Sequence, residues 1–145
     1  MKYKIIFIIK VLLAILLIYA GTYKVAQFDT FKTQMHESPL LPAFFVPYIA
    51  VIVPIFEIAL GISLLLFSKL ERDLLLISSS LMLFFSLYLI ILYTSYDKPP
   101  CSCGGILGNM SYEIHIPFNI VFTILPLIAV FLLNKNKTET EPVSS

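Results

Sequence analysis

Apolar residues dominate four long stretches of the chain, and polar residues gather between them. The stretches cover residues 5–23, 44–67, 74–93 and 116–133. A helix needs about 20 mostly apolar residues to cross the hydrocarbon core of a bilayer. The pattern therefore predicts an all-α membrane protein, a four-transmembrane-helix bundle within residues 1–133, followed by a disordered cytoplasmic tail in residues 134–145.

In the polar segment after the first stretch, apolar residues recur at the spacing of a helix. Phe28, Phe31 and Met35 recur there at helical spacing among polar residues. Such a pattern is typical of an amphipathic helix that lies in the membrane interface. We therefore expect a short interfacial amphipathic helix after the first span.

Composition agrees with a membrane protein, since 59% of the 145 residues are hydrophobic and 13% are charged. The chain has no phosphate-binding loop, dinucleotide fingerprint or HExxH motif. We expect the lipid bilayer as its surroundings and no nucleic acid partner.

The basic start before the first apolar stretch also resembles a secretory signal peptide. Because Lys10 interrupts that stretch and three spans follow it, we expect an uncleaved helix instead.

Basic residues are distributed unequally between the two sides of the predicted bundle, and cytoplasmic loops carry the excess of Lys and Arg. In a bacterial cell this predicts an inner-membrane protein with both termini in the cytoplasm and the cysteine loop in the periplasm. The side of the termini carries Lys2, Lys4, Lys69, Arg72, Lys135 and Lys137, and the other side carries Lys24, Lys32 and Lys98.

Both cysteines of the chain lie in one polar loop, as Cys101-Ser-Cys103. A disulfide across this spacing would be strained, and strained, exposed disulfides tend to exchange. Lys98 and the backbone amides of Gly104 and Gly105 would favour the reactive thiolate. A fixed bond is the structural alternative, although so small a ring stabilises little.

The fourth apolar stretch begins with a possible proton acceptor. Pro117 suits the first turn of a helix that starts near Ile116, which would place His115 and Asn119 on one face. His115 would act either as a proton acceptor for a thiol or as an interfacial histidine with its polar tip in water. Together with Cys101 and Cys103 it would alternatively hold a soft metal ion, although the sequence offers no fourth ligand.

Glu57 is the only acidic residue deep inside a predicted span. An intramembrane charge is costly and is usually paired or functional. We expect Glu57 to pair with Lys10 or to be protonated, in a mainly architectural role.

Four sequence features follow one another along the chain, namely Gly21-Thr-Tyr-Lys24, Phe28-Asp-Thr-Phe31, Pro54-x-x-Glu57-x-x-x-Gly61 and Cys101-x-Cys103-Gly104-Gly105 with His115 and Phe118-Asn119. Together they resemble the MauE/DoxX-type family of redox-associated membrane proteins. The resemblance implies a four-helix bundle that exchanges electrons with a periplasmic thioredoxin-like partner, as in methylamine utilisation. Our first hypothesis is therefore a thiol:disulfide oxidoreductase with Cys101, Cys103 and His115 as catalytic residues. A quinone in the bilayer would be its one candidate cofactor, although no residue demands one. The alternatives are a non-catalytic assembly or transport factor with a structural disulfide, and a protein that handles soft metals.

Overall fold

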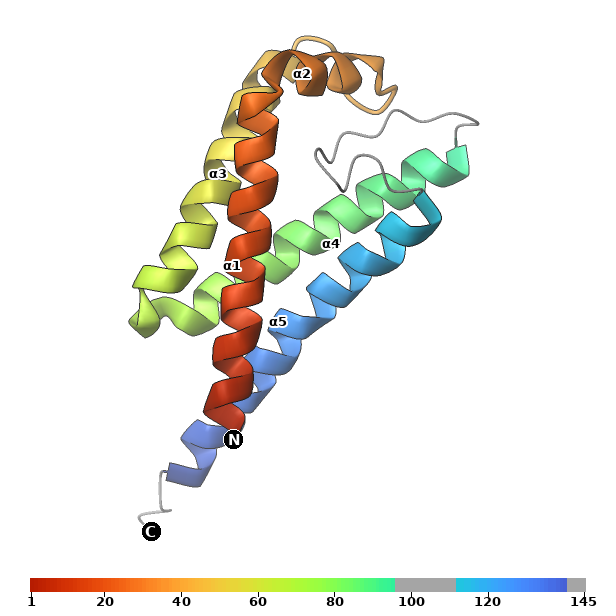
Figure 1. Ribbon diagram of the computed structural model, residues 1–145. Coiled ribbons are helices and arrows are strands. Elements are labelled where there is room, and N and C mark those ends of the chain that lie inside the picture. Colours follow the sequence, from red (N-terminus) through yellow and green to blue (C-terminus); the bar gives the residue numbers. More distant parts are fainter. Residues whose placement is uncertain (96–111, 141–145) are drawn as a thin grey trace.

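A computed structural model describes residues 1–95 and 112–140 of the chain, and every regular element in them is helical (Figure 1). Four of the helices are long and apolar enough to cross a membrane, which confirms the predicted fold class. The elements are α1 (Lys2–Ala26), α2 (Phe28–Glu37), α3 (Val46–Leu66), the short 3₁₀ turn η1 (Ser68–Leu70), α4 (Glu71–Ser95) and α5 (Tyr112–Thr140).

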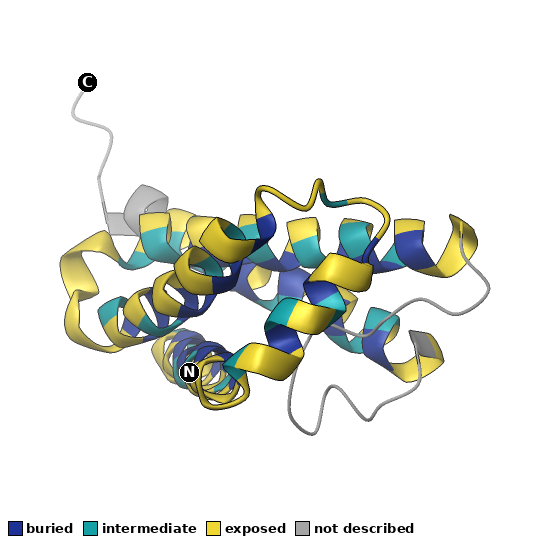
Figure 2. Cartoon of the chain, turned by 90° about the horizontal axis from the view of Figure 1, so that it is seen from above, coloured by how far each residue is buried: buried dark blue, intermediate teal, exposed yellow. Residues whose placement is uncertain are grey.

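The four long helices form two antiparallel pairs. Helix α1 packs chiefly against α3, and α4 packs chiefly against α5, while α1 also touches α5 (Figure 1). Buried residues lie on the faces that the helices turn toward one another, and the outward faces are exposed (Figure 2). Large apolar side chains such as Ile52 and Phe131 are on those outer faces, where lipid chains would cover them in a bilayer.

Two glycines allow α1 and α3 to approach closely. A Cβ atom added at Gly21 would lie 2.7 Å from the Pro54 carbonyl oxygen, and one added at Gly61 would lie 2.9 Å from the Ala14 carbonyl oxygen. Real Cβ atoms do not approach backbone oxygens so closely, so only glycine fits at either position. Small residues at a contact are a common way for membrane helices to pack, because no hydrophobic force joins helices within lipid.

Helices α4 and α5 share an apolar core, and one hydroxyl group also links them. Ser79 in α4 donates a hydrogen bond of 2.8 Å to the Thr123 carbonyl in α5. The Ser78 and Ser86 hydroxyls donate to carbonyls of their own helix, those of Leu74 and Met82, at 2.8 Å each. Each buried hydroxyl therefore has a partner, which an apolar environment requires.

Helix α2 confirms the interfacial helix that the pattern predicted. Phe31 and Met35 are each 5% exposed, and they pack against Val46 and Ala50 at the start of α3. The other face of α2 carries exposed polar residues, including Asp29, Thr30 and Thr33. The amphipathic face thus covers α3 at the end of the bundle away from the chain termini (Figure 1).

Helix α5 is longer at both ends than the apolar pattern predicted. It begins at Tyr112, so Pro117 lies inside the helix rather than in its first turn. The carbonyl that a proline leaves free belongs to the residue four positions earlier, here the exposed Glu113, which water can reach. At the other end the helix continues to Thr140, so residues 134–140, expected to be disordered, are helical. A helix already formed extends at little cost, one hydrogen bond for each residue added.

Candidate functional site

A buried ion pair joins α1 and α3. The Lys24 ammonium lies 2.5 Å from Glu57 Oε1, and the two side chains are 6% and 1% exposed. Two opposite charges that are both withdrawn from solvent attract strongly, and neither can be removed cheaply. This pair is the most enclosed charged group in the described part of the chain.

The glycine contacts bring the two charges together. Gly21 lies three residues before Lys24, and Gly61 lies four residues after Glu57, so each glycine shares a helix face with its charge. The Cβ that Gly21 lacks would fall 3.2 Å from the Glu57 Cβ. The two glycine-and-charge motifs singled out in the sequence are therefore one structural unit, in which close approach of the backbones sets the distance between the charges.

Aromatic rings surround the lysine on its other sides. Lys24 Nζ lies 5.0 Å from the centre of the Phe85 ring in α4 and 5.7 Å from that of Phe31 in α2. Cations are attracted to aromatic faces at such distances. Lys24 thus contacts groups from α2, α3 and α4, whereas Glu57 Oε2 has no hydrogen-bond partner among the residues that the structure describes.

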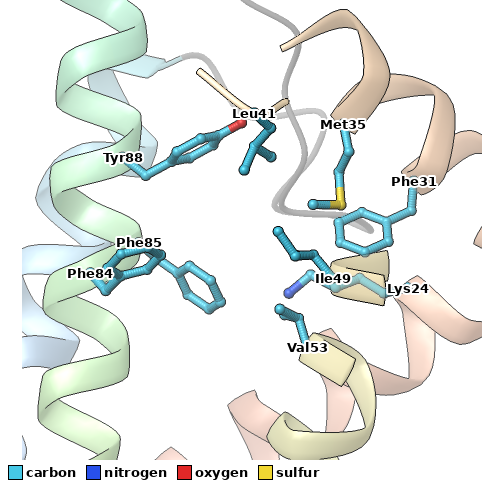
Figure 3. Close-up of a pocket in the computed structure, with 9 residues that line it drawn as sticks. All are labelled: Lys24, Phe31, Met35, Leu41, Ile49, Val53, Phe84, Phe85 and Tyr88. Atoms are coloured by element: carbon cyan, nitrogen blue, oxygen red, sulfur yellow. The ribbon is translucent and has the colours of Figure 1, made fainter. Parts of the chain in front are cut away.

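A cavity of about 130 Å³ opens beside this lysine (Figure 3). The Lys24 nitrogen points into it between Val53 and the Phe85 ring (Figure 3). At the far edge of the cavity, the Tyr88 hydroxyl donates a hydrogen bond of 2.6 Å to Ser38 Oγ. The remaining walls are apolar side chains from four segments, namely Phe31, Met35, Leu41, Ile49 and Phe84.

The predicted pair of Lys10 with Glu57 is wrong. Lys10 instead lies 3.1 Å from Glu71 Oε1, in the first turn of α4. The apolar pattern ended the first span at residue 23, but α1 continues to Ala26, and the extra turn carries Lys24 into the bundle. The charge nearest to Glu57 therefore comes from the end of α1 opposite to the one that carries Lys10.

His115 and Asn119 lie on one face of α5, as their spacing predicted. They are 1% and 5% exposed, so His115 is enclosed by protein and does not hold its polar tip in water. One turn further, Thr123 donates a hydrogen bond of 2.8 Å to the Asn119 carbonyl. His115, Asn119 and Thr123 thus form a buried polar stripe along α5.

The predicted residues Lys98, Cys101, Cys103, Gly104 and Gly105 lie outside the described residues. Within residues 1–95 and 112–140, no group of three His, Cys, Asp or Glu side chains could hold a metal ion. Because two of the three proposed ligands are cysteines outside this range, the metal hypothesis stays a prediction. The end of α4 and the start of α5, which flank the cysteine segment, lie toward the same end of the bundle as α2 (Figure 1).

The fold and the ion pair define a multi-pass membrane protein with one enclosed Lys–Glu pair in its described helices. The family model described as methylamine utilisation protein MauE matches residues 2–133, and the chain belongs to that family. No curated protein and no solved structure matches the chain. The matched range includes all of the motifs that carried the resemblance.

Proposed function

We propose that the protein is a membrane thiol–disulfide redox protein that uses Cys101 and Cys103. Membership in the MauE family supports this function. The observation that carries it furthest is the enclosed His115, which lies in the first turns of α5 and twelve residues after Cys103. A histidine near neutrality accepts a proton from a thiol and returns it.

The proposed exchange takes place in two steps, and in each step a thiolate attacks a disulfide and displaces another thiolate. In the direction that oxidises the partner, a thiolate of a thioredoxin-like protein attacks Cys101 Sγ, and Cys103 leaves as a thiolate. The second partner thiol, once deprotonated, then attacks the mixed disulfide, which releases an oxidised partner and a reduced Cys101–Cys103 pair. Two electrons move to this chain, and His115 takes up a proton. Lys98 and the amides of Gly104 and Gly105 favour the thiolate form.

The partner reaches the cysteines from the periplasm in this proposal. The excess of Lys and Arg on the side of the termini supports cytoplasmic termini in a bacterial inner membrane. The segment between α4 and α5 then faces the compartment where disulfides persist. Accessibility of Cys101 and Cys103 to a membrane-impermeant thiol reagent in intact cells tests this orientation, and labelling only after lysis would contradict it.

A thiol-trapping titration tests the redox function. Membranes are equilibrated across a graded thiol redox buffer, and free cysteines are tagged with a reagent that adds mass. We expect a reversible midpoint for the Cys101–Cys103 pair. In the reverse direction of exchange, the Cys101 thiolate attacks the disulfide of an oxidised partner and Cys103 resolves the adduct, so we expect Cys103→Ser to trap a mixed disulfide through Cys101. A pair that stays oxidised in strong reductant would indicate a structural disulfide instead. A pair that never oxidises, with a bound soft metal lost on Cys→Ser or His115→Ala change, would indicate metal handling.

A further inference from the structure

We propose that the cavity beside Lys24 binds the ring of a neutral, lipid-soluble molecule that carries a carbonyl oxygen, such as an alkylated benzoquinone. The inference concerns binding in the described helices and does not rest on the thiol–disulfide function. It follows from the size of the cavity, the aromatic residues in its walls and the Lys24 ammonium, whose charge is balanced by Glu57.

The cavity has the size of a single ring. Its volume is about 130 Å³. An engineered apolar cavity of about 150 Å³ accepts benzene, whereas sites for whole drug-sized ligands measure about 300–1,000 Å³. A six-membered ring therefore fits inside, and a longer ligand must leave its remainder outside. Phe84 in the cavity wall is 66% exposed, so an alkyl tail has an exit toward the lipid-facing surface.

The walls suit a flat apolar ring. Four of the lining residues are aromatic, and they come from α2 and α4. Aromatic side chains pack against a ring by offset stacking or edge-to-face contact. A linear alkyl chain would gain no such contacts from them. The aromatic residues are Phe31, Phe84, Phe85 and Tyr88.

Lys24 supplies the polar recognition. An ammonium group has three N–H donors, and the hydrogen bond to Glu57 is the one that the described residues give it. The nitrogen faces the cavity (Figure 3), so a ligand oxygen there can accept a hydrogen bond from it. Glu57 already balances the charge of Lys24, so an anion would gain little and would approach a buried carboxylate. An acceptor without charge, as in a ketone or quinone, fits this site better.

Binding is measured on the full chain in lipid nanodiscs, with empty nanodiscs as the background. The probes are a decyl-substituted benzoquinone, decylbenzene and decanoate, which share a tail and differ in ring and oxygen. We expect about one decylbenzoquinone per chain above background. We also expect it to bind about 10-fold tighter than decylbenzene, the factor that a hydrogen bond to a charged donor provides. Decanoate should bind no better than decylbenzene.

Two substitutions in α3 test whether the ligand binds in the cavity. Val53→Phe fills the cavity and replaces neither member of the ion pair, whereas Val51→Phe adds the same bulk on the exposed face of α3. We expect Val53→Phe to weaken decylbenzoquinone binding by about 10-fold or more and Val51→Phe to leave it unchanged, with equal helical content in both. Equal binding by both variants, or retention no greater than in empty nanodiscs, would overturn the site. Equal affinity for decylbenzene, or tighter binding of decanoate, would overturn the recognition by Lys24.

Discussion

Helix α1 forms two ion pairs, one through Lys10 and one through Lys24, and the two pairs differ in how far water can reach them. The carboxylate partner of Lys24 is 1% exposed and lies 2.5 Å away, whereas that of Lys10 is 20% exposed and lies 3.1 Å away. Glu57 is in the middle of a spanning helix, while Glu71 begins α4 beside the chain's polar turn η1. Separating lysine from glutamate should therefore cost more free energy in the Lys24–Glu57 pair than in the Lys10–Glu71 pair.

This contrast explains why only one of the pairs is built into a glycine contact. A charge left alone in a low-dielectric interior has no solvent to replace its partner. Gly21 and Gly61 hold the backbones of α1 and α3 close enough to keep Lys24 and Glu57 together. Glu71, the partner of Lys10, instead lies in the first turn of α4, where its side chain is 20% exposed and keeps part of its hydration. The first pair is thus a fixed part of the bundle, and the second is a local contact.

The largest expected effect follows from breaking the enclosed pair on one side only. Glu57→Leu leaves the Lys24 ammonium buried without its carboxylate, which should lower the free energy of unfolding by about 3–5 kcal/mol. Denaturation in detergent, followed by circular dichroism, measures the loss. A Glu57→Leu protein as stable as the wild type would show that the enclosed pair is not a structural requirement.

A smaller effect is expected at the glycine contact. Gly21→Leu forces α1 away from the Pro54 carbonyl and should cost about 1–3 kcal/mol, the usual penalty for overpacking. Ala59→Leu is the matched control, because residue 59 lies on the exposed face of α3. Comparison of the two unfolding midpoints isolates the contact. Equal midpoints would mean that α1 and α3 need no close approach.

The less enclosed pair, Lys10 with Glu71, should matter less than either of these. Lys10→Met removes the contact with Glu71, and we expect a loss of about 1 kcal/mol or less, because water can solvate the remaining carboxylate. Lys4→Met, at an exposed position of the same helix, serves as the control. If Lys10→Met cost as much as Glu57→Leu, the contrast between the two pairs would fail.

The smallest effect is expected between α4 and α5. Ser79→Ala removes the interhelical hydrogen bond to Thr123 and should cost about 0.6 kcal/mol, a typical value for such bonds between membrane helices. Ser80→Ala removes a hydroxyl that bonds only within α4 and should be neutral. The difference between these neighbouring variants, read from denaturation curves, checks the account of this helix pair.

Much of the fold could be predicted from the apolar pattern, because lipid permits few ways to satisfy a spanning backbone. The four spans and the interfacial α2 followed from length and periodicity. The ion-pair partner of Glu57 could not be predicted in this way. Lys24 lies at the edge of an apolar run, and its charge does not show whether the first helix ends before residue 24 or continues past it. Phe84, Phe85 and Tyr88 were also missed as cavity residues, because in a membrane helix an aromatic residue that faces lipid looks the same in sequence as one that faces a cavity.

A double-mutant cycle on Lys24 and Glu57 tests the central claim most directly. The unfolding free energies of Lys24→Met, Glu57→Leu and the double variant are compared with that of the wild type. We expect each single change to cost about 3–5 kcal/mol and the double variant to cost less than either of them, so the coupling energy should exceed about 3 kcal/mol. Additive losses, with no coupling within about 0.5 kcal/mol, would show that Lys24 and Glu57 do not form the pair on which this account rests.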